Sequence, residues 1–300
     1  MQKKNRKSQS DKTLEYKVGE PAELLKFLLT ALSNRSRNSV KSILARGQVT
    51  VDDHIETQYN YELQPGQRVT ILKNKAAVKQ DALIGMEIVY EDEHLIVINK
   101  EAGLLSIANE KEKERTAHHQ LMEYVRREHP QNRIFVVHRL DKDTSGVMMF
   151  AKSEKVKHIL QDDWKRNVTE RTYMALVEGK VAKHQYKITS WLRESKTRLM
   201  YSSQTKNDGL YAATQYKVVQ QNEEFSLLEV QLETGRKNQI RVHMQDIGHP
   251  VVGDKKYGSK SKGLRRLGLH AKVLAFKHPI TGKQMRFEAD VPKSFLTKSK

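Results

Sequence analysis

The chain has no cysteine among its 300 residues, and this absence excludes several chemistries at once. Without thiols there are no disulfides, no thiolate nucleophile and no zinc knuckle built on cysteine. No apolar run approaches the roughly 18 to 20 residues needed to cross a membrane. The apolar N-terminal stretch 22–32 contains Glu23 and Lys26 at helical spacing and does not form a signal-peptide core. We therefore expect a soluble, cytoplasmic protein without a membrane partner.

Motifs for the common cofactors are missing as well. The sequence contains no Walker loop, no dinucleotide fingerprint and no Gly-x-Ser-x-Gly elbow. Of its 12 histidines, those at 118, 119, 138, 243, 249, 270 and 278 show no zinc-like spacing, so each of these is expected to be structural or to contact a bound partner, not to ligate a metal. We expect neither a cofactor nor a metal.

Negative charge is scarce relative to positive charge. The sequence has 54 Lys and Arg against 36 Asp and Glu, a formal net charge of +18. Such an excess favours polyanionic partners, because each neutralised phosphate releases counterions. Charge alone does not distinguish nucleic acid from an anionic membrane surface.

The N-terminal quarter of the chain predicts a basic arm followed by a small module. Residues 1–20 are expected to be a disordered arm, since they have little apolar content. In 21–73, leucines at helical spacing, a second short helix ended by Gly47, and alternating valines predict two helices and a small sheet. Cations line one side of this segment, at Arg35, Arg37, Lys41 and Arg46. The segment resembles the RNA-binding module named after ribosomal protein S four, which implies RNA binding; the alternative is a generic helical pair with solvated cations.

A linker is expected at 74–85, and a larger body at 86–300. Strand-like patterns occur at 88–90, 95–99, 134–137, 147–151, 172–177, 212–219 and 225–232, and helical patterns at 116–128, 153–165 and 238–247. This order predicts an α+β body with a mixed, mainly antiparallel sheet and flanking helices, not a doubly wound parallel sheet.

The string HRLDKDTSG at 138–146 lies between two apolar, strand-like runs. It places the carboxylate of Asp141 between the cations Arg139 and Lys142, which favour its ionised form and can hold phosphates. Taken alone, Arg-Leu-Asp is a common tripeptide that indicates a surface salt bridge at a hairpin end. The complete string resembles the signature loop of the RluA-type RNA pseudouridine synthases.

Further strings extend this resemblance over about 88–291, in the order expected for the family. They are INKEAGLL at 98–105, ERTYMALVEG at 170–179, TGRKNQIRVHM at 234–244, HPVVGDKKYG at 249–258 and LHA at 269–271. The resemblance implies that Asp141 is the essential catalytic group, held in a bidentate pair by Arg241. It implies that Tyr173 stacks on the base and helps remove the proton at carbon 5. Ile240 would line the base pocket, and Arg139 would fill the space left by the flipped nucleotide.

The implied activity is isomerisation of uridine to pseudouridine, in large-subunit ribosomal RNA or in transfer RNA, by a monomer. Asp141 either attacks the sugar carbon or assists glycal formation. Two other functions remain open. The first is a noncatalytic RNA-binding or ribosome-assembly factor on the same fold. The second is a hydrolase that uses Asp141 on a nucleoside or glycoside, although such enzymes usually bring a second carboxylate.

Overall fold

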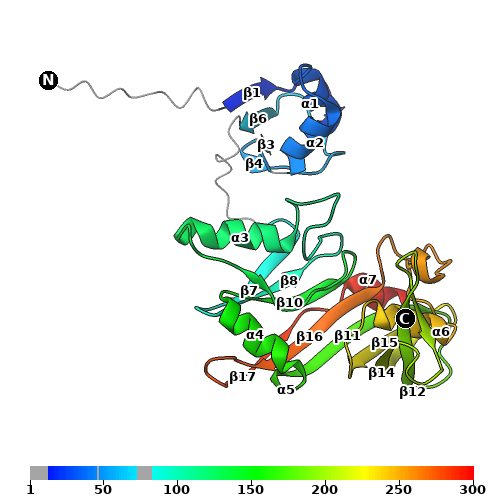
Figure 1. Cartoon of the computed structure of the whole chain (residues 1–300). Coiled ribbons are helices and arrows are strands. Elements are labelled where there is room, and N and C mark those ends of the chain that lie inside the picture. Colours follow the sequence, from blue (N-terminus) through cyan, green and yellow to red (C-terminus); the bar gives the residue numbers. More distant parts are fainter. Residues whose placement is uncertain (1–12, 46, 73–82) are drawn as a thin grey trace. The chain divides into compact units, whose positions relative to one another are not determined.

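The computed structural model describes residues 13–45, 47–72 and 83–300. Contacts within the chain divide it into two compact units, residues 1–82 and residues 83–300 (Figure 1). Most of the expected linker, including 74–82, lies outside the described residues. At its end, the N–H of Ile84 donates to Oε1 of Gln120 at 2.7 Å, which ties residues 83–85 to the larger unit.

The smaller unit has two helices and a four-stranded sheet around one apolar core. Helix α1 spans Leu24–Ala31 and α2 spans Arg37–Ala45, where the spacing of apolar residues predicts them. The sheet order is β1-β6-β3-β4, and the strands are Thr13–Lys17, Arg68–Leu72, Val49–Val51 and His54–Ile55. A separate pair joins β2 (Ala22–Glu23) to β5 (Glu62–Leu63).

Strand β1 corrects the expectation of a disordered arm over 1–20. Thr13–Lys17 pairs antiparallel with β6, and Leu14 and Tyr16 pack against the core of the smaller unit. The prediction was wrong for these five residues because two apolar side chains are a weak local signal. Pairing with β6, which is distant in the sequence, gives the backbone N–H and C=O groups of Thr13–Lys17 their hydrogen-bond partners. Residues 1–12 lie outside the described ranges.

The larger unit is built on an eleven-stranded sheet with the order β13-β12-β14-β15-β11-β16-β10-β8-β7; β17 pairs with β16, and β9 with β10. The strands are β7 (Met86–Glu91), β8 (Leu95–Lys100), β9 (Phe135–Val136), β10 (Ser145–Ala151), β11 (Val168–Glu178), β12 (Gln185–Glu194), β13 (Met200–Ser203), β14 (Leu210–Gln221), β15 (Phe225–Leu232), β16 (Leu269–Lys277) and β17 (Gln284–Glu288). Among the described strands of this sheet, β10 and β16 pair in parallel and the other pairs are antiparallel. The expected mixed, mainly antiparallel sheet is therefore confirmed.

The helices of this unit are α3 (Ala117–Glu128), α4 (Glu154–Asp162), α5 (Trp164–Asn167), α6 (Gln239–Asp246) and α7 (Lys293–Lys298), with a 3₁₀ turn at Lys255–Tyr257. The side chains of Thr116 and Ser153 cap α3 and α4 by accepting backbone N–H groups. The helix expected at 153–165 is instead two helices, because Asp163 leaves the helical conformation between them. Within the described ranges, no helix is long and apolar enough to cross a membrane.

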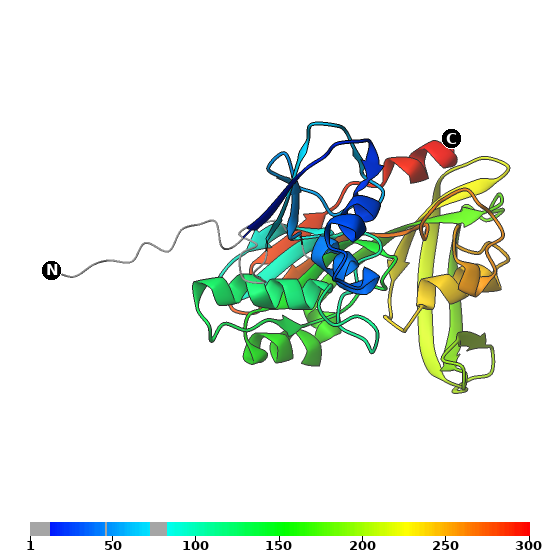
Figure 2. The same ribbon diagram turned by 90° about the horizontal axis from the view of Figure 1, so that it is seen from above.

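The two faces of the sheet are covered by different helices. Along β11, Ala175 and Val177 share a core with α6, whereas Met174 and Leu176 share a core with α7. Helix α3 packs over the β7, β8 and β10 end, and α6 over the β12, β14 and β15 end (Figure 1, Figure 2). Tyr173 lies between these two cores, on the face that α3 and α6 share.

Four strands of the sheet, β12, β13, β16 and β17, lie where the sequence patterns predicted no strand. The central strand β16 is buried on both faces, so its apolar residues do not alternate with polar ones. On β12 an inward position is polar, because Ser190 is buried against His243 with 2.9 Å between Oγ and Nε2.

Candidate active site

The loop that carries Asp141 is held by hydrogen bonds from the end of β8 and from the segment that follows it. Oγ of Ser106 donates to the carbonyl of Leu140 at 2.7 Å, and the N–H of Leu140 returns a bond of 3.2 Å. Two donors reach the carbonyl of Lys142: the N–H of Gly103 at 2.9 Å and Nζ of the buried Lys100 at 3.1 Å. Burial lowers the pKa of Lys100 to about 8. The carboxylate of Asp141 therefore projects from a backbone that is fixed on both sides.

Gly146, the last residue of the signature string, is required by close packing. Its φ is +113°, and a Cβ atom placed there would lie 2.0 Å from the carbonyl oxygen of Ala271. The contact arises because β10 pairs in parallel with β16 at this point, with Gly146 opposite Ala271. No side chain fits between these two strands at this point, so tertiary packing requires a glycine here.

Arg241, from α6, contacts Asp141 with one nitrogen only. Its Nη1 donates to Oδ2 of Asp141 at 3.1 Å. The bidentate contact goes instead to Asp254, with 2.6 Å from Nε to Oδ2 and 2.8 Å from Nη2 to Oδ1. The expected bidentate pair with Asp141 is therefore wrong. Asp254 holds the fork because its side chain is 1% exposed and lies beside Arg241, whereas the side chain of Asp141 is 36% exposed.

Asp254 is a site residue that sequence reasoning missed, although it lies in the string HPVVGDKKYG. A buried carboxylate requires a partner, but the sequence does not show which aspartate is buried. Burial disfavours the charge of Arg241, yet the bonds and charges of Asp254 and Asp141 outweigh burial and raise its pKa. Arg241 therefore stays a cation that two carboxylates share.

Asn238 completes the surroundings of Arg241 from the N-terminus of α6. It has a left-handed backbone with φ of 54°, which asparagine tolerates better than most residues. Its Oδ1 accepts from Nη1 of Arg241 at 3.1 Å, and its Nδ2 donates to the hydroxyl of Tyr257 at 2.9 Å. The guanidinium also lies 4.8 Å above the ring of Tyr257. Arg241 is thus held by contacts on its edge and on its face.

A pocket of about 200 Å³ opens beside Asp141. It is lined by residues that include Arg139, Tyr173, Ile240 and Leu269. The structure therefore brings Asp141, Tyr173, Arg241, Arg139 and Ile240 together, as the sequence motifs predict. Arg139 is exposed at this pocket, and Ile240 is buried in its wall. Burial raises the pKa of Tyr173; Arg171 opposes this in part and the charge of Asp141 adds to it, so the phenol is neutral at pH 7.

A larger groove of about 1000 Å³ continues from the same carboxylate. Its lining is strongly basic, with Lys142, Lys237, Lys255, Lys256, Lys262, Arg265 and Arg266. The acidic residues in the lining are Asp141, Asp143 and Asp254, and the last of these is neutralised by Arg241. The groove can therefore hold an anionic chain next to Asp141.

The cations expected to bind RNA in the smaller unit lie on or before α2. Arg35 and Arg37 are exposed, and Lys41 is half-buried with its Nζ 5.5 Å above the ring of Tyr59. Arg46 lies outside the described residues. These three belong to the smaller unit, whereas the residues that line the pocket beside Asp141 belong to the larger unit.

The sequence matches a known protein family. The family model described as RNA pseudouridylate synthase matches residues 94–246. YlyB of Bacillus subtilis (strain 168), named as an uncharacterized RNA pseudouridine synthase, is 35% identical over 275 residues, which cover 89% of each protein. Ribosomal large subunit pseudouridine synthase D of Vibrio vulnificus (strain CMCP6) is 33% identical over 86% of this chain and 83% of its own. Ribosomal large subunit pseudouridine synthase C of Salmonella typhi is 32% identical over 89% of this chain and 88% of its own.

A solved structure is similar as well. Human RNA pseudouridylate synthase domain containing 1 superposes with a TM-score of 0.56 at 25% sequence identity, covering 71% of this chain and 86% of its own.

Proposed function

This chain belongs to the RNA pseudouridine synthase family, which isomerises uridine to pseudouridine in RNA, and we propose that its substrate is ribosomal RNA and that Asp141 is its catalytic residue. The names of the relatives that act on the large ribosomal subunit support this choice of RNA. The net charge of +18 and the basic groove beside Asp141 fit a large polyanion.

The reaction breaks one bond to the sugar and makes another. The bond from N1 of uracil to C1′ breaks, the base turns, and C5 becomes bonded to C1′; C5 loses a proton and N1 gains one. There is no net oxidation or reduction. Asp141 acts through its carboxylate, either by adding to C1′ or by assisting loss of a sugar proton. Among the described residues, no hydrogen-bond donor reaches its Oδ1, so this oxygen is available to the substrate.

Arg241 positions Asp141 without taking up both of its oxygens. Because Asp254 holds the fork of Arg241, the cation makes a single bond to Asp141. The group of two carboxylates and one guanidinium keeps a net negative charge, which suits a nucleophile or base. This arrangement is the observation that carries the proposal.

Tyr173 stacks on the uracil in the proposed complex. The ring lies in the wall of the pocket, and its raised pKa keeps the phenol protonated. A neutral phenol is a poor base at pH 7, so stacking fits Tyr173 better than removal of the C5 proton. Ile240 supplies an apolar wall for the base. The exposed Arg139 fills the space that the flipped nucleotide leaves in the stack of bases.

The smaller unit is proposed as an RNA-binding module like that of ribosomal protein S four, joined to a catalytic domain at 83–300. Its two helices, small sheet and exposed Arg35 and Arg37 support this assignment. Phosphate contacts made by a second unit would help choose a structured target.

The test is a carbodiimide map of pseudouridine in unmodified ribosomal RNA incubated with wild-type protein or with Asp141→Asn. We expect new pseudouridine with the wild type and none with the variant, at equal RNA binding. Product from both proteins would show that the carboxylate of Asp141 is not needed for the reaction. Binding without product from either would favour the noncatalytic RNA-binding factor, and release of free uracil would favour a hydrolase. Modification of transfer RNA alone would overturn the choice of ribosomal RNA.

A further inference from the structure

The face of the sheet away from α6 carries aromatic side chains on β12, β13 and β14. Trp191 and Tyr211 lie directly opposite each other, with ring centroids 5.7 Å apart at an angle of 64°. Tyr211 is 42% exposed, and Tyr201 on β13 is 41% exposed. The guanidinium of Arg193, opposite Tyr201, lies 5.9 Å from the centroid of its ring. Exposed rings beside cations are an uncommon lining for a merely solvated strand face.

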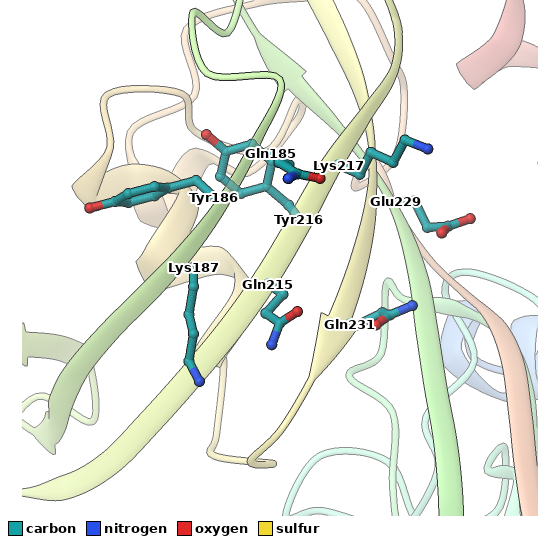
Figure 3. Close-up of a pocket in the computed structure, with 8 residues that line it drawn as sticks. All are labelled: Gln185, Tyr186, Lys187, Gln215, Tyr216, Lys217, Glu229 and Gln231. Atoms are coloured by element: carbon teal, nitrogen blue, oxygen red, sulfur yellow. The ribbon is translucent and has the colours of Figure 1, made fainter.

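The same face continues along the strands as a polar hollow of about 490 Å³. Figure 3 shows Lys187, Gln215 and Gln231 in one row across β12, β14 and β15, as the strand register requires. The next row holds Gln185, Lys217 and Glu229, with Lys217 directly opposite Glu229. Lys187 is paired with Glu233 at 2.7 Å, whereas Lys217 has no ion-pair partner among the described residues. The hollow therefore offers amide groups, which can both donate and accept, together with one lysine that lies opposite a glutamate without forming an ion pair among the described residues.

This face is continuous with the rim of the pocket beside Asp141. Arg236 lines that pocket, and its Nε donates to the carbonyl of Tyr211 at 3.0 Å. Lys237 lines both the pocket and the basic groove, and it pairs with Glu194 at the end of β12. An RNA strand that leaves the pocket over Arg236 and passes around the start of β14 would reach the side chain of Tyr211 on the opposite face of the sheet.

We propose that the outer face of β12 and β14, defined by Trp191, Tyr211, Lys187, Gln215 and Lys217, binds an unpaired stretch of RNA next to the target uridine. This inference rests on the proposed function. Aromatic rings accept any base by stacking, and the amides and the lysine supply contacts to base edges and phosphate. From Tyr211 to Lys217 the strand rises about 20 Å, which is enough for several nucleotides. The face therefore extends substrate binding beyond the flipped base.

Fluorescence tests the stacking directly, because Trp164 and Trp191 are the two tryptophans of the chain. A short single-stranded oligouridylate is titrated into wild type and into Trp191→Phe. We expect quenching in the wild type and loss of most of that quenching in the variant. Equal quenching in both proteins would assign the signal to Trp164 and overturn the proposal.

Kinetics with ribosomal RNA tests the consequence for the reaction. We expect the double variant Trp191→Leu, Tyr211→Ala to raise KM roughly tenfold with kcat within about twofold, and Tyr211→Phe to keep the wild-type KM. Val89→Ser is the matched control, because Val89 is an exposed apolar residue on β7, at the opposite edge of the sheet. Far-ultraviolet circular dichroism and thermal unfolding verify that the double variant folds.

The two proposals fail in different ways. Product formed by a folded double variant at an unchanged KM would overturn this inference and leave the proposed function intact. No product from the wild type would overturn the proposed function itself.

Discussion

Arginines in the two units of this protein are held in opposite ways. Arg241 in the larger unit is 14% exposed, donates four hydrogen bonds to three side chains and lies above an aromatic ring. Arg35 and Arg37 in the smaller unit are exposed at the start of α2. The first arrangement fixes one geometry, as a reaction centre requires. The second offers charge without a fixed geometry, which suffices for binding a phosphate backbone.

This difference between a buried and an exposed set of arginines predicts how each unit responds to substitution. Buried, cooperative contacts fail together when one member is removed, whereas exposed charges contribute separately and weakly. The four predictions that follow test this contrast, beginning with the largest effect.

Replacing Arg241 should have the largest effect, because all three nitrogens of its planar guanidinium donate hydrogen bonds to carboxylates. Arg241→Lys keeps the charge but cannot bond both Asp254 and Asp141 in this geometry, so we expect kcat to fall by about 100-fold or more. Single-turnover kinetics on ribosomal RNA measures this, with Arg35→Lys as the control in the smaller unit. A loss of less than tenfold would show that the fork is not needed.

Gly146→Ala should destabilise the larger unit more than any exposed substitution. The added methyl would collide with the carbonyl of Ala271, so β10 and β16 must separate beneath the loop of Asp141. We expect a loss of about 3 kcal/mol or more in the free energy of unfolding, as is typical of overpacking combined with backbone strain. Denaturant unfolding checks this, and Gly66→Ala is the control. Gly66 also has a positive φ, but nothing lies within 4 Å of the added atom. Similar losses for both variants would attribute the effect to φ rather than to the collision.

Acid should destabilise the larger unit selectively. Burial lowers the pKa of His243 and of His270 to about 4, from an ordinary value of 6.5. The unfolded chain therefore binds more protons between these values, so stability is fully present above pH 6.5 and declines as the pH falls toward 4. His54, the histidine of the smaller unit, is exposed. The midpoint temperature of thermal unfolding should fall as the pH is lowered from 7 to 4.5. His243→Gln should make this dependence on pH less steep. An equal slope in that variant would contradict this assignment.

Removing the cations on and before α2 of the smaller unit should have the smallest effect. For Arg35→Gln, Arg37→Gln and Lys41→Gln combined, we expect RNA affinity to fall several-fold and the slope of log K against log salt to decrease by about 2. We expect kcat to remain unchanged. Filter binding at several salt concentrations measures this, and Lys26→Gln on α1, where Lys26 pairs with Glu23, is the control. A large loss of kcat would mean that the smaller unit takes part in the reaction.

Much of the fold could be predicted because its signals are local. The helix at 117–128 follows from apolar spacing and the cap at Thr116, and β15 from a run of apolar residues. Strand β1 could not be predicted, since Leu14 and Tyr16 are a weak signal until β6 lies beside them. Strand β12 was missed because Ser190 is polar and buried, and only His243 on a distant helix explains why.

The sequence by itself determined the residue types of the site and its family. Asp141, Tyr173 and Arg241 each lie in a motif that is readable along the chain, because turn residues and strand patterns act over a few positions. Only the tertiary structure decided how these groups are connected. Asp141 and Arg241 are 100 positions apart, and the packing of α6 against the sheet sets which nitrogen meets which carboxylate. Asp254 became the main partner of Arg241 because burial leaves its charge no water to solvate it, and burial is a property of the assembled fold.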